Sequence, residues 1–414
     1  MDQFLLKEVV IQQNDFHLDE NTIEREIDLP TDRLITIITG IRRCGKSTLL
    51  QQIRKKNTEN NYYLNFDDER LFKFQLEDFQ TLIEIFIALY GKQNTYYFDE
   101  IQNVEGWERF IRRLHDEGNK IYITGSNAKM LSRELGTHLT GRYIQIELFP
   151  FSFSEFLKFN HFEIPNDSFY KADTKALLNN YFDEYFEIGG FPDFIKTKNP
   201  EYLNSLYESI LYRDILVRNK ILTEYKIKNL VFFISSNISK LISYNNLKSI
   251  IDVKHPETVK KYLTYLQNSY LIFLIYKFDY SIKKQIINPQ KVYFIDTGLA
   301  SSTGFSFSEN KGRFLGNIVF LELKRRKKDI YYFKKEKECD FLIFSNKKIK
   351  EAIQITVSLE NHETYKREID GLINAMKEYN LKNGTIITRN ERKSLEIDGL
   401  TINVVPIWQW LLEK

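Results

Sequence analysis

The sequence predicts an α/β protein with a parallel sheet near its N-terminus, followed by helical segments and a second, smaller α/β domain. Three observations carry this prediction. Strand-like and helix-like runs alternate over residues 33–148, a glycine-rich loop joins the first strand to the first helix, and a new α/β pattern begins near residue 312. A chain of 414 residues is too long for one ordinary core, so several domains are expected.

The first α/β region is predicted from short β-branched and aromatic runs separated by amphipathic stretches. The runs expected to be strands are 34–39, 62–66, 95–98, 121–124 and 143–148, and the segments expected to be helices are 46–56, 76–90 and 107–116. Such alternation indicates right-handed βαβ units with helices on both faces of a parallel sheet.

Composition and charge exclude several classes of protein. The formal net charge of +3 is small for this length, so no global field favours nucleic acid or a membrane surface. Cys44 and Cys339 match no metal or redox spacing. The N-terminus lacks the pattern of a secretory leader, and the apolar run 271–276 is too short to span a bilayer. We therefore expect a cytoplasmic protein with no membrane segment.

The stretch "ITIITGIRRCGKSTLLQQI" carries the first chemical signal. Gly40 is followed after four residues by Gly45, Lys46 and Ser47, with a strand before and a helix after. Glycines let backbone N–H groups wrap a phosphate, the lysine reaches the β- and γ-phosphates, and the hydroxyl binds Mg²⁺. The alternative is an ordinary glycine turn. The residues expected to bind nucleotide are Gly40, Ile41, Arg42, Arg43, Cys44, Gly45, Lys46, Ser47 and Thr48, with Arg42 and Arg43 as outward-facing loop residues.

An acidic pair in "YYFDEIQ" is the second signal. Asp99 ends a buried-type strand, where it would accept a hydrogen bond from metal-bound water and share the metal with Ser47. Glu100 would orient and polarise the attacking water, a role that favours ATP hydrolysis. The competing interpretation is an acidic helix cap after the strand.

Two further positions complete the expected site. Ser126 or Asn127 follows a strand in "IYITGSNAKML", where strand ends form the ligand crevice of a parallel sheet, so either is a candidate sensor of the γ-phosphate; a helix cap is the rival role. Arg142 begins another strand and is a candidate finger arginine, with a surface salt bridge as the alternative. The expected catalytic residues are thus Lys46, Glu100, Asn127 and Arg142.

These motifs together resemble a known family. The segments GIRRCGKST, YYFDEIQ, ITGSN, GRYIQIELFPFSFSEF, GGFP (189–192) and LYRDI (211–215) are similar to those of bacterial and archaeal AAA-type ATPases with a C-terminal restriction-endonuclease-like domain of unknown function. The resemblance covers nearly the whole chain. It implies a P-loop ATPase core over 1–155, a helical segment over 156–235, a winged-helix-like unit over 236–300 and an endonuclease-like domain over 301–414, with ATP and Mg²⁺ as cofactors.

Residues 245–278 read as helix, turn, helix and extended run, which suggests a winged-helix unit. The segment 256–268 would be its recognition helix, with Lys254, Lys260 and Lys261 placed to meet phosphates. No arginine is placed to read base edges. DNA contact and a structural or partner-binding role both remain open.

The last domain resembles the PD-(D/E)xK nuclease fold, in which two acids and a lysine bind metal and activate water. Asp340 takes the first acid position, but Gln354 and Thr356 stand where the second acid and the lysine belong. Gly316 occupies another position that is often acidic in related domains, which leaves Glu322 as the nearby carboxylate. We therefore do not expect nuclease activity.

The basic stretch 324–338 suits either a nucleic-acid backbone, an acidic partner, or the alternating charge of an exposed hairpin. Three functions follow from the sequence. The first is an ATPase that drives its C-terminal module, and the second is a low-turnover switch that controls DNA or protein docking through residues 240–405. The third is a nucleic-acid-processing enzyme that uses Asp340. A homo-oligomer is expected if Arg142 acts on a neighbouring subunit.

Overall fold

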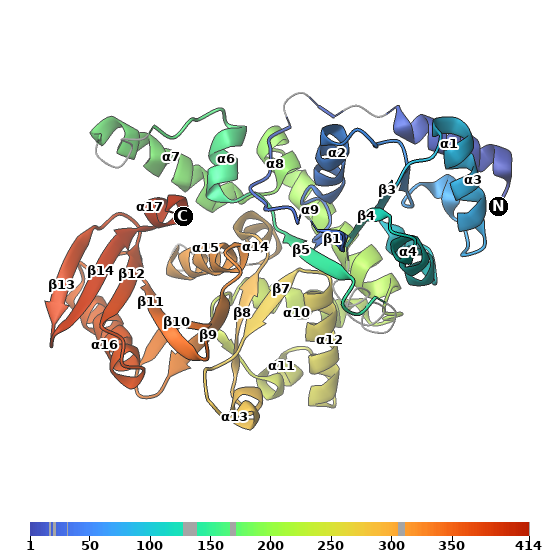
Figure 1. Ribbon diagram of the computed structural model, residues 1–414. Helices are drawn as coiled ribbons and strands as arrows, with labels where there is room; N and C mark the ends of the chain where they lie inside the picture. The colour runs from blue at the N-terminus through green and yellow to red at the C-terminus, as the bar shows by residue number, and fades with distance from the viewer. Residues whose placement is uncertain are drawn as a thin grey trace. The chain divides into compact units, whose positions relative to one another are not determined.

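The computed structural model describes residues 1–15, 18–19, 22–30, 32–126, 139–165, 171–304 and 311–413 (Figure 1). The chain forms two compact units. One contains Met1–Leu148 with Asn268–Tyr270, and the other contains Phe149–Gln267 with Leu271–Lys414. None of the described helices is both long and apolar enough to cross a membrane.

The first unit is a five-stranded sheet, ordered β2-β3-β4-β1-β5, whose neighbouring strands are all parallel. Its elements are α1 (Gln3–Asn14), β1 (Ile35–Gly40), α2 (Lys46–Lys56), β2 (Tyr63–Asn65), η1 (Glu69–Leu71), α3 (Asp78–Tyr90), β3 (Thr95–Asp99), η2 (Ile101–Asn103), α4 (Trp107–Asp116), β4 (Lys120–Gly125) and β5 (Tyr143–Leu148). The predicted parallel α/β sheet is thereby confirmed, whereas α1 was not predicted.

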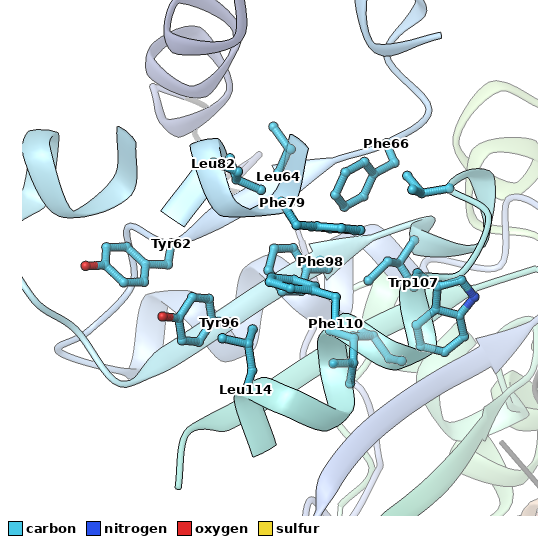
Figure 2. Close-up of a cluster of buried hydrophobic side chains, with 14 of the residues drawn as sticks. Tyr62, Leu64, Phe66, Phe79, Leu82, Tyr96, Phe98, Trp107, Phe110 and Leu114 are labelled. Carbon is cyan, nitrogen blue, oxygen red and sulfur yellow. The ribbon is translucent and has the colours of Figure 1, made fainter. Parts of the chain in front are cut away.

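Alternation along the strands builds an aromatic core on one face of this sheet. Phe98 of β3 packs there beside the side chains of α3 and α4 (Figure 2). The rings of Phe79 and Phe110 stack with their centroids 3.9 Å apart, so the two helices meet directly over the strands. Because successive side chains of a strand point to opposite faces, the other residues of β3 are left for α2.

The opposite face is covered by α2. Arg54 of α2 lies 4.2 Å from the ring centroid of Tyr63 in β2, and Tyr97 of β3 stacks on Tyr122 of β4. The sheet is therefore buried on both faces, as is typical of parallel sheets. Its carboxyl edge, where β1, β3 and β4 end, is the place at which polar side chains can gather.

The second unit contains helices and two sheets. Its elements are α6 (Phe153–Phe159), α7 (Ala172–Ile188), α8 (Pro192–Thr197), α9 (Pro200–Ser209), the π-helical η3 (Ile210–Val217), α10 (Glu224–Ser235), β6 (Leu241–Ile242), α11 (Tyr244–Ile250), α12 (Pro256–Asn268), β7 (Ile272–Ile275), α13 (Ile282–Ile287), β8 (Gln290–Phe294), α14 (Thr297–Thr303), α15 (Lys311–Arg325), β9 (Asp329–Lys334), β10 (Glu338–Ser345), β11 (Lys348–Ile355), α16 (His362–Glu378), β12 (Asn383–Thr388), β13 (Lys393–Ile397), β14 (Leu400–Pro406) and α17 (Ile407–Leu412).

The smaller sheet is antiparallel, ordered β6-β8-β7, and follows α10 with α11 and α12 inserted between β6 and β7. Helix α12 has the bounds predicted for a recognition helix, and it buries Val259, Leu263 and Leu266. Lys260 and Lys261 are exposed on its other side. The assignment of these elements as a winged helix stays a prediction.

The larger sheet has six strands, ordered β13-β14-β12-β11-β10-β9, and is mixed (Figure 1). Only the pairs β11–β12 and β12–β14 are parallel. Helix α16 packs on it through Leu372, Ala375 and Met376. The strand predicted at 352–357 is in fact β11, which starts earlier and ends at Ile355, so Thr356 follows the strand. The endonuclease-like assignment of this domain stays a prediction.

The GGFP segment is held by a buried carboxylate. Asp296 caps α14 by accepting from Leu299 N at 2.9 Å, and its other oxygen accepts from Gly190 N at 2.6 Å. A Cβ at Gly190 would lie 2.4 Å from the carbonyl oxygen of Phe151, so only glycine fits there. This explains why the long helical region breaks at residues 188–192.

Residues Asn268–Tyr270, which are the last residue of α12 and the two residues after it, cluster with the first unit. Tyr270 is 3% exposed and has a left-handed backbone, with φ of 62°. Its hydroxyl lies 3.4 Å from Nε2 of Gln145 in β5. The first unit therefore contains a segment that the sequence places more than a hundred residues downstream.

Candidate nucleotide site

The loop between β1 and α2 has the backbone that its glycines predict. Gly40 has φ of 150°, and a Cβ there would lie 2.1 Å from the carbonyl oxygen of Leu148. Gly45 has φ of 99° and starts α2 from a left-handed conformation. Arg43 is exposed and is also left-handed, with φ of 64°. Close backbone packing thus fixes the loop at the N-terminus of α2, where helix N–H groups favour an anion.

Lys46 folds over this loop. Its side chain is 4% exposed, and its ammonium donates to the carbonyl oxygen of Ile41 at 3.1 Å. The same nitrogen lies 3.6 Å from Oε1 of Glu100. The lysine of the loop and the glutamate of the acidic pair, which lie on different elements, therefore meet.

Asp99 ends β3 in a fully buried position. The hydroxyl of Thr124, at the end of β4, donates to its Oδ1. Burial, followed by the neighbouring charge of Glu100, raises the pKa of Asp99 to about 6, although hydrogen bonds from Thr124 and Ser47 oppose the shift. Ser47 and Asp99 are thus brought together, as the sequence predicts for residues that share a metal.

Glu100 follows the strand in a left-handed conformation, with φ of 50°. Its backbone N–H donates to the Thr124 hydroxyl at 2.9 Å, and the amide of Gln102 donates to its Oε2. Thr124 therefore joins both acids. It was missed in the sequence, although a threonine at the end of the strand beside β3 is the signal that could have found it.

A second missed residue comes from the N-terminal segment. The guanidinium of Arg25 donates to the carbonyl oxygen of Cys44 at 2.9 Å, and a Cβ at Gly45 would lie 3.3 Å from its Nη1. Gln52 of α2 donates to Ile23 O at 2.6 Å, which holds this segment against the helix. Arg25 thus adds a positive charge beside the loop, and no local sequence pattern reveals it.

Ser126 follows β4 and is 1% exposed. Within the part of the chain that the structure describes, its hydroxyl oxygen has no hydrogen-bond partner. A buried polar atom without a partner is uncommon and marks a place for a ligand or water. Asn127, the other candidate sensor, lies outside the described residues.

Arg142 lies at the other end of the sheet. β5 pairs with β1 so that Tyr143 stands opposite Ile35 and Leu148 opposite Gly40. Arg142 is therefore one strand length, roughly 17 Å, from the loop. Its Nε lies 3.2 Å from Asp116 Oδ1, the surface salt bridge that was the alternative role. Within one chain Arg142 does not meet the loop.

Asp340, the acid expected at a nuclease site in the C-terminal domain, already forms an ion pair. Asp340 Oδ1 accepts from the ammonium of Lys291 at 2.9 Å, and Oδ2 accepts from Ile355 N at 3.0 Å. Glu322, the other nearby carboxylate of the sequence, pairs with Arg326 at 2.8 Å. Glu368 on α16, which accepts a hydrogen bond from the amide of Gln354, is a nearby acid that the sequence analysis did not name.

The basic stretch 324–338 is mostly paired with acids. Lys328 meets Glu351 at 3.2 Å, and Lys335 meets Glu378 at 2.6 Å. Arg325 donates to the carbonyl oxygen of Pro150 at 3.0 Å. These pairs favour the alternating charge of an exposed hairpin over a free basic surface.

Comparison with known proteins identifies two matching family models and two relatives of similar length. A family described as "AAA domain" matches residues 32–157, and a "domain of unknown function (DUF8612)" matches residues 179–309. The uncharacterized protein MJ1544 of Methanocaldococcus jannaschii is 36% identical over 99% of this chain and 96% of its own length. An uncharacterized protein of Haemophilus influenzae is 31% identical over 95% of this chain and 98% of its own length.

Solved structures overlap only weakly. The Orc1 protein of Aeropyrum pernix, solved in complex with DNA, is 10% identical, with a TM-score of 0.26 over 73% of this chain and 90% of that one. RuvB of Thermotoga maritima is 14% identical, with a TM-score of 0.27 over 58% of this chain and 81% of that one. Scores this low do not establish a shared arrangement. The full-length relatives do establish kinship: the chain belongs to a family of AAA-domain proteins with members in Methanocaldococcus jannaschii and Haemophilus influenzae.

Proposed function

We propose that this protein is a Mg²⁺-dependent ATPase that converts ATP to ADP and phosphate. The observation that carries the proposal is the convergence of Lys46, Ser47, Asp99 and Glu100 at the carboxyl edge of the parallel sheet. Ordinary glycine turns and helix caps do not place a buried lysine beside two adjacent acids.

The residues present fit the magnesium complex of ATP. The backbone of residues 40–45 and the ammonium of Lys46 would hold the phosphates. Ser47 and Asp99, whose side chains lie close enough to interact, would hold Mg²⁺, which neutralises charge on the phosphates. Glu100 would orient the attacking water and polarise it, and Ser126, or Asn127 as its alternative in the sequence, would sense the γ-phosphate.

The test uses two variants of the full chain. Lys46→Ala is expected to abolish ATP binding, because it removes the cation that meets the phosphates. Glu100→Gln is expected to keep ATP binding while hydrolysis falls by a factor on the order of 10² or more, since the amide accepts no proton. ATP binding by both variants is measured with fluorescent ATP. If Glu100→Gln hydrolysed ATP at the wild-type rate, the mechanism would be contradicted.

A low-turnover switch is a second candidate, and one contact favours it. Glu100 is held by both Lys46 and Gln102, so it must give up part of this pairing before it polarises water. Slow basal hydrolysis together with partner binding that requires ATP would identify a switch. A high basal rate, with partner binding insensitive to nucleotide, would identify an ATPase of the first kind.

The work driven by ATP is proposed to pass to the C-terminal module, through DNA or protein docking on residues 240–405. Exposed lysines on α12 support this, whereas the paired hairpin and neutralised Asp340 weigh against nucleic-acid cleavage. Purification of the Glu100→Gln variant in ATP, compared with Lys46→Ala as the control, identifies the partner. A partner recovered equally with both variants would refute nucleotide coupling.

A further inference from the structure

A polar cavity of about 920 Å³ lies in the second unit, lined by residues of β10, β11 and α16 among others. It contains Asp340, Gln354 and Thr356, the positions at which a nuclease of this type would carry its two acids and its lysine. The cavity therefore lies where a nuclease of this type would have its active site, and the negative charge of its carboxylates must be balanced by a cation.

A buried lysine from another sheet supplies that balance. Lys291 of β8 is 1% exposed, and its ammonium lies 2.9 Å from Asp340 Oδ1 and 2.7 Å from Glu338 Oε1. Both acids belong to β10 and contact the same ammonium, so their side chains project toward Lys291. Burial lowers the pKa of Lys291, but the charges of Asp340 and Glu338 outweigh burial and raise it. The side chain is therefore an ammonium ion.

The second half of a metal site is replaced by neutral and paired groups. Gln354 Oε1 accepts from the backbone N–H of Asp340 at 3.1 Å, and the Gln354 amide donates to Glu368. Arg367 Nε donates to Glu368 at 3.0 Å. Within the described ranges, no group of three His, Cys, Asp or Glu side chains is placed to hold a metal ion.

We propose that Lys291 is the resident cation of this carboxylate site and takes the position that a divalent metal would otherwise occupy. A magnesium ion sits about 2.0–2.1 Å from its oxygen ligands, whereas charge-assisted hydrogen bonds have the 2.7–2.9 Å lengths seen here. An ammonium fills the space between the two carboxylates but activates no water. The carboxylates of the cavity are therefore balanced without a metal ion. This proposal does not rest on ATP hydrolysis.

The experiment is a Mn²⁺ titration of full-length protein without nucleotide, followed by electron paramagnetic resonance of free Mn²⁺. Lys291→Met is expected to gain one Mn²⁺ site per chain, at least about tenfold tighter than any site of the wild type, because two carboxylates are freed for the metal. Lys291→Met/Asp340→Asn is the matched control. It keeps the phosphate loop, so it reports any Mn²⁺ bound there, and it is expected to show no gain.

Two results would overturn the proposal. One is a folded Lys291→Met protein that gains no Mn²⁺ site. The lysine would then only link two sheets through its ion pairs. The other is Mn²⁺ binding by the wild type that is lost in Asp340→Asn. That result would mean that metal and ammonium occupy the site together. The second comparison decides the matter even if Lys291→Met does not fold, since equal Mn²⁺ binding by wild type and Asp340→Asn is the expected result.

Discussion

At the scale of single residues, Asp99 and Glu100 are neighbours in sequence with different environments. Asp99 is fully buried under Thr124 and Ser47, whereas Glu100 turns out of the strand toward Lys46 and Gln102. Burial favours the protonated form of a carboxyl group, and a metal ligand must be ionised. The acid expected to hold Mg²⁺ is thus one whose burial raises its pKa and favours its protonated form.

This environment predicts the pH dependence of hydrolysis. The pKa of Asp99 is raised to about 6, so its ionised form is lost as the pH falls through that value. The quotient kcat/KM, which reports groups of the free enzyme, is expected to fall about tenfold per pH unit below this point. The measurement is a profile of kcat/KM from pH 5 to 8 at subsaturating Mg²⁺, because saturating metal would compete with the proton for Asp99.

Thr124 assigns that profile to Asp99. Its hydrogen bond lowers the pKa of Asp99, so Thr124→Val should move the acidic midpoint to higher pH, while Thr124→Ser keeps the hydroxyl and the midpoint. An acidic limb that stays in place in Thr124→Val belongs to another group.

At the scale of elements, glycines and caps decide where the long helical region breaks. Asp296 ties the N-terminus of α14 to the loop after α7 through Gly190. Gly189, with φ of 77°, brings the backbone so close that a Cβ would lie 2.2 Å from Asp296 Oδ1. The GGFP motif is therefore a packing device that fits one carboxylate.

Gly190→Ala is expected to lower the free energy of unfolding by roughly 2–4 kcal/mol, because its Cβ would overlap the Phe151 carbonyl oxygen at 2.4 Å. Gly312→Ala is the control, since its Cβ meets only Val357, at an ordinary 3.8 Å. Urea unfolding followed by circular dichroism compares the two. Equal midpoints for both variants would show that the loop yields at little cost.

Sequence patterns located most elements because their signals are local. The predicted bounds of α4 and α12 match the structure, since apolar periodicity and the turns around Gly106 and Pro256 mark them. Strand β13 escaped because Lys393–Ile397 is largely exposed and lacks a buried alternating face. The glycine loop after β1 and the acidic pair at the end of β3 stand out in the sequence for the same local reasons, and their part in nucleotide binding stays a prediction.

The partners of the site residues were not predictable from local patterns. Arg25, Thr124 and Lys291 reach their partners through tertiary contacts, across 19, 25 and 49 residues of sequence. Strand register and tertiary packing decide such pairs, and neither can be predicted from a short stretch of sequence. From Gln354 and Thr356 the sequence predicts an incomplete nuclease motif, but it does not reveal that Lys291 lies between Glu338 and Asp340.

At the scale of the whole molecule, the position of Arg142 bears on assembly. It lies at the amino edge of the sheet, whereas the phosphate loop lies at the carboxyl edge. A finger role therefore requires a second copy of the chain, because one sheet cannot present both edges to one phosphate.

Arg142→Ala is expected to reduce hydrolysis by a factor on the order of 10³ if it acts across subunits, while ATP binding persists. Mixing it with Lys46→Ala should restore part of the activity, since mixed assemblies contain intact sites. Mass measurement with and without ATP checks the assembly. A monomer with full activity in Arg142→Ala would leave only the salt bridge to Asp116.

The three residues Asn268–Tyr270 also constrain how such a protein can be rearranged by recombination. A gene fusion that joins residues 1–148 to a new module would inherit Gln145 without Tyr270, the tyrosine whose hydroxyl lies beside it. Exchange at a single junction is thus disfavoured, because the nucleotide-binding unit is not one uninterrupted stretch of the gene. The helices and sheets that follow residue 148 are expected to have been inherited with the nucleotide-binding unit, in agreement with relatives that match over nearly their full length.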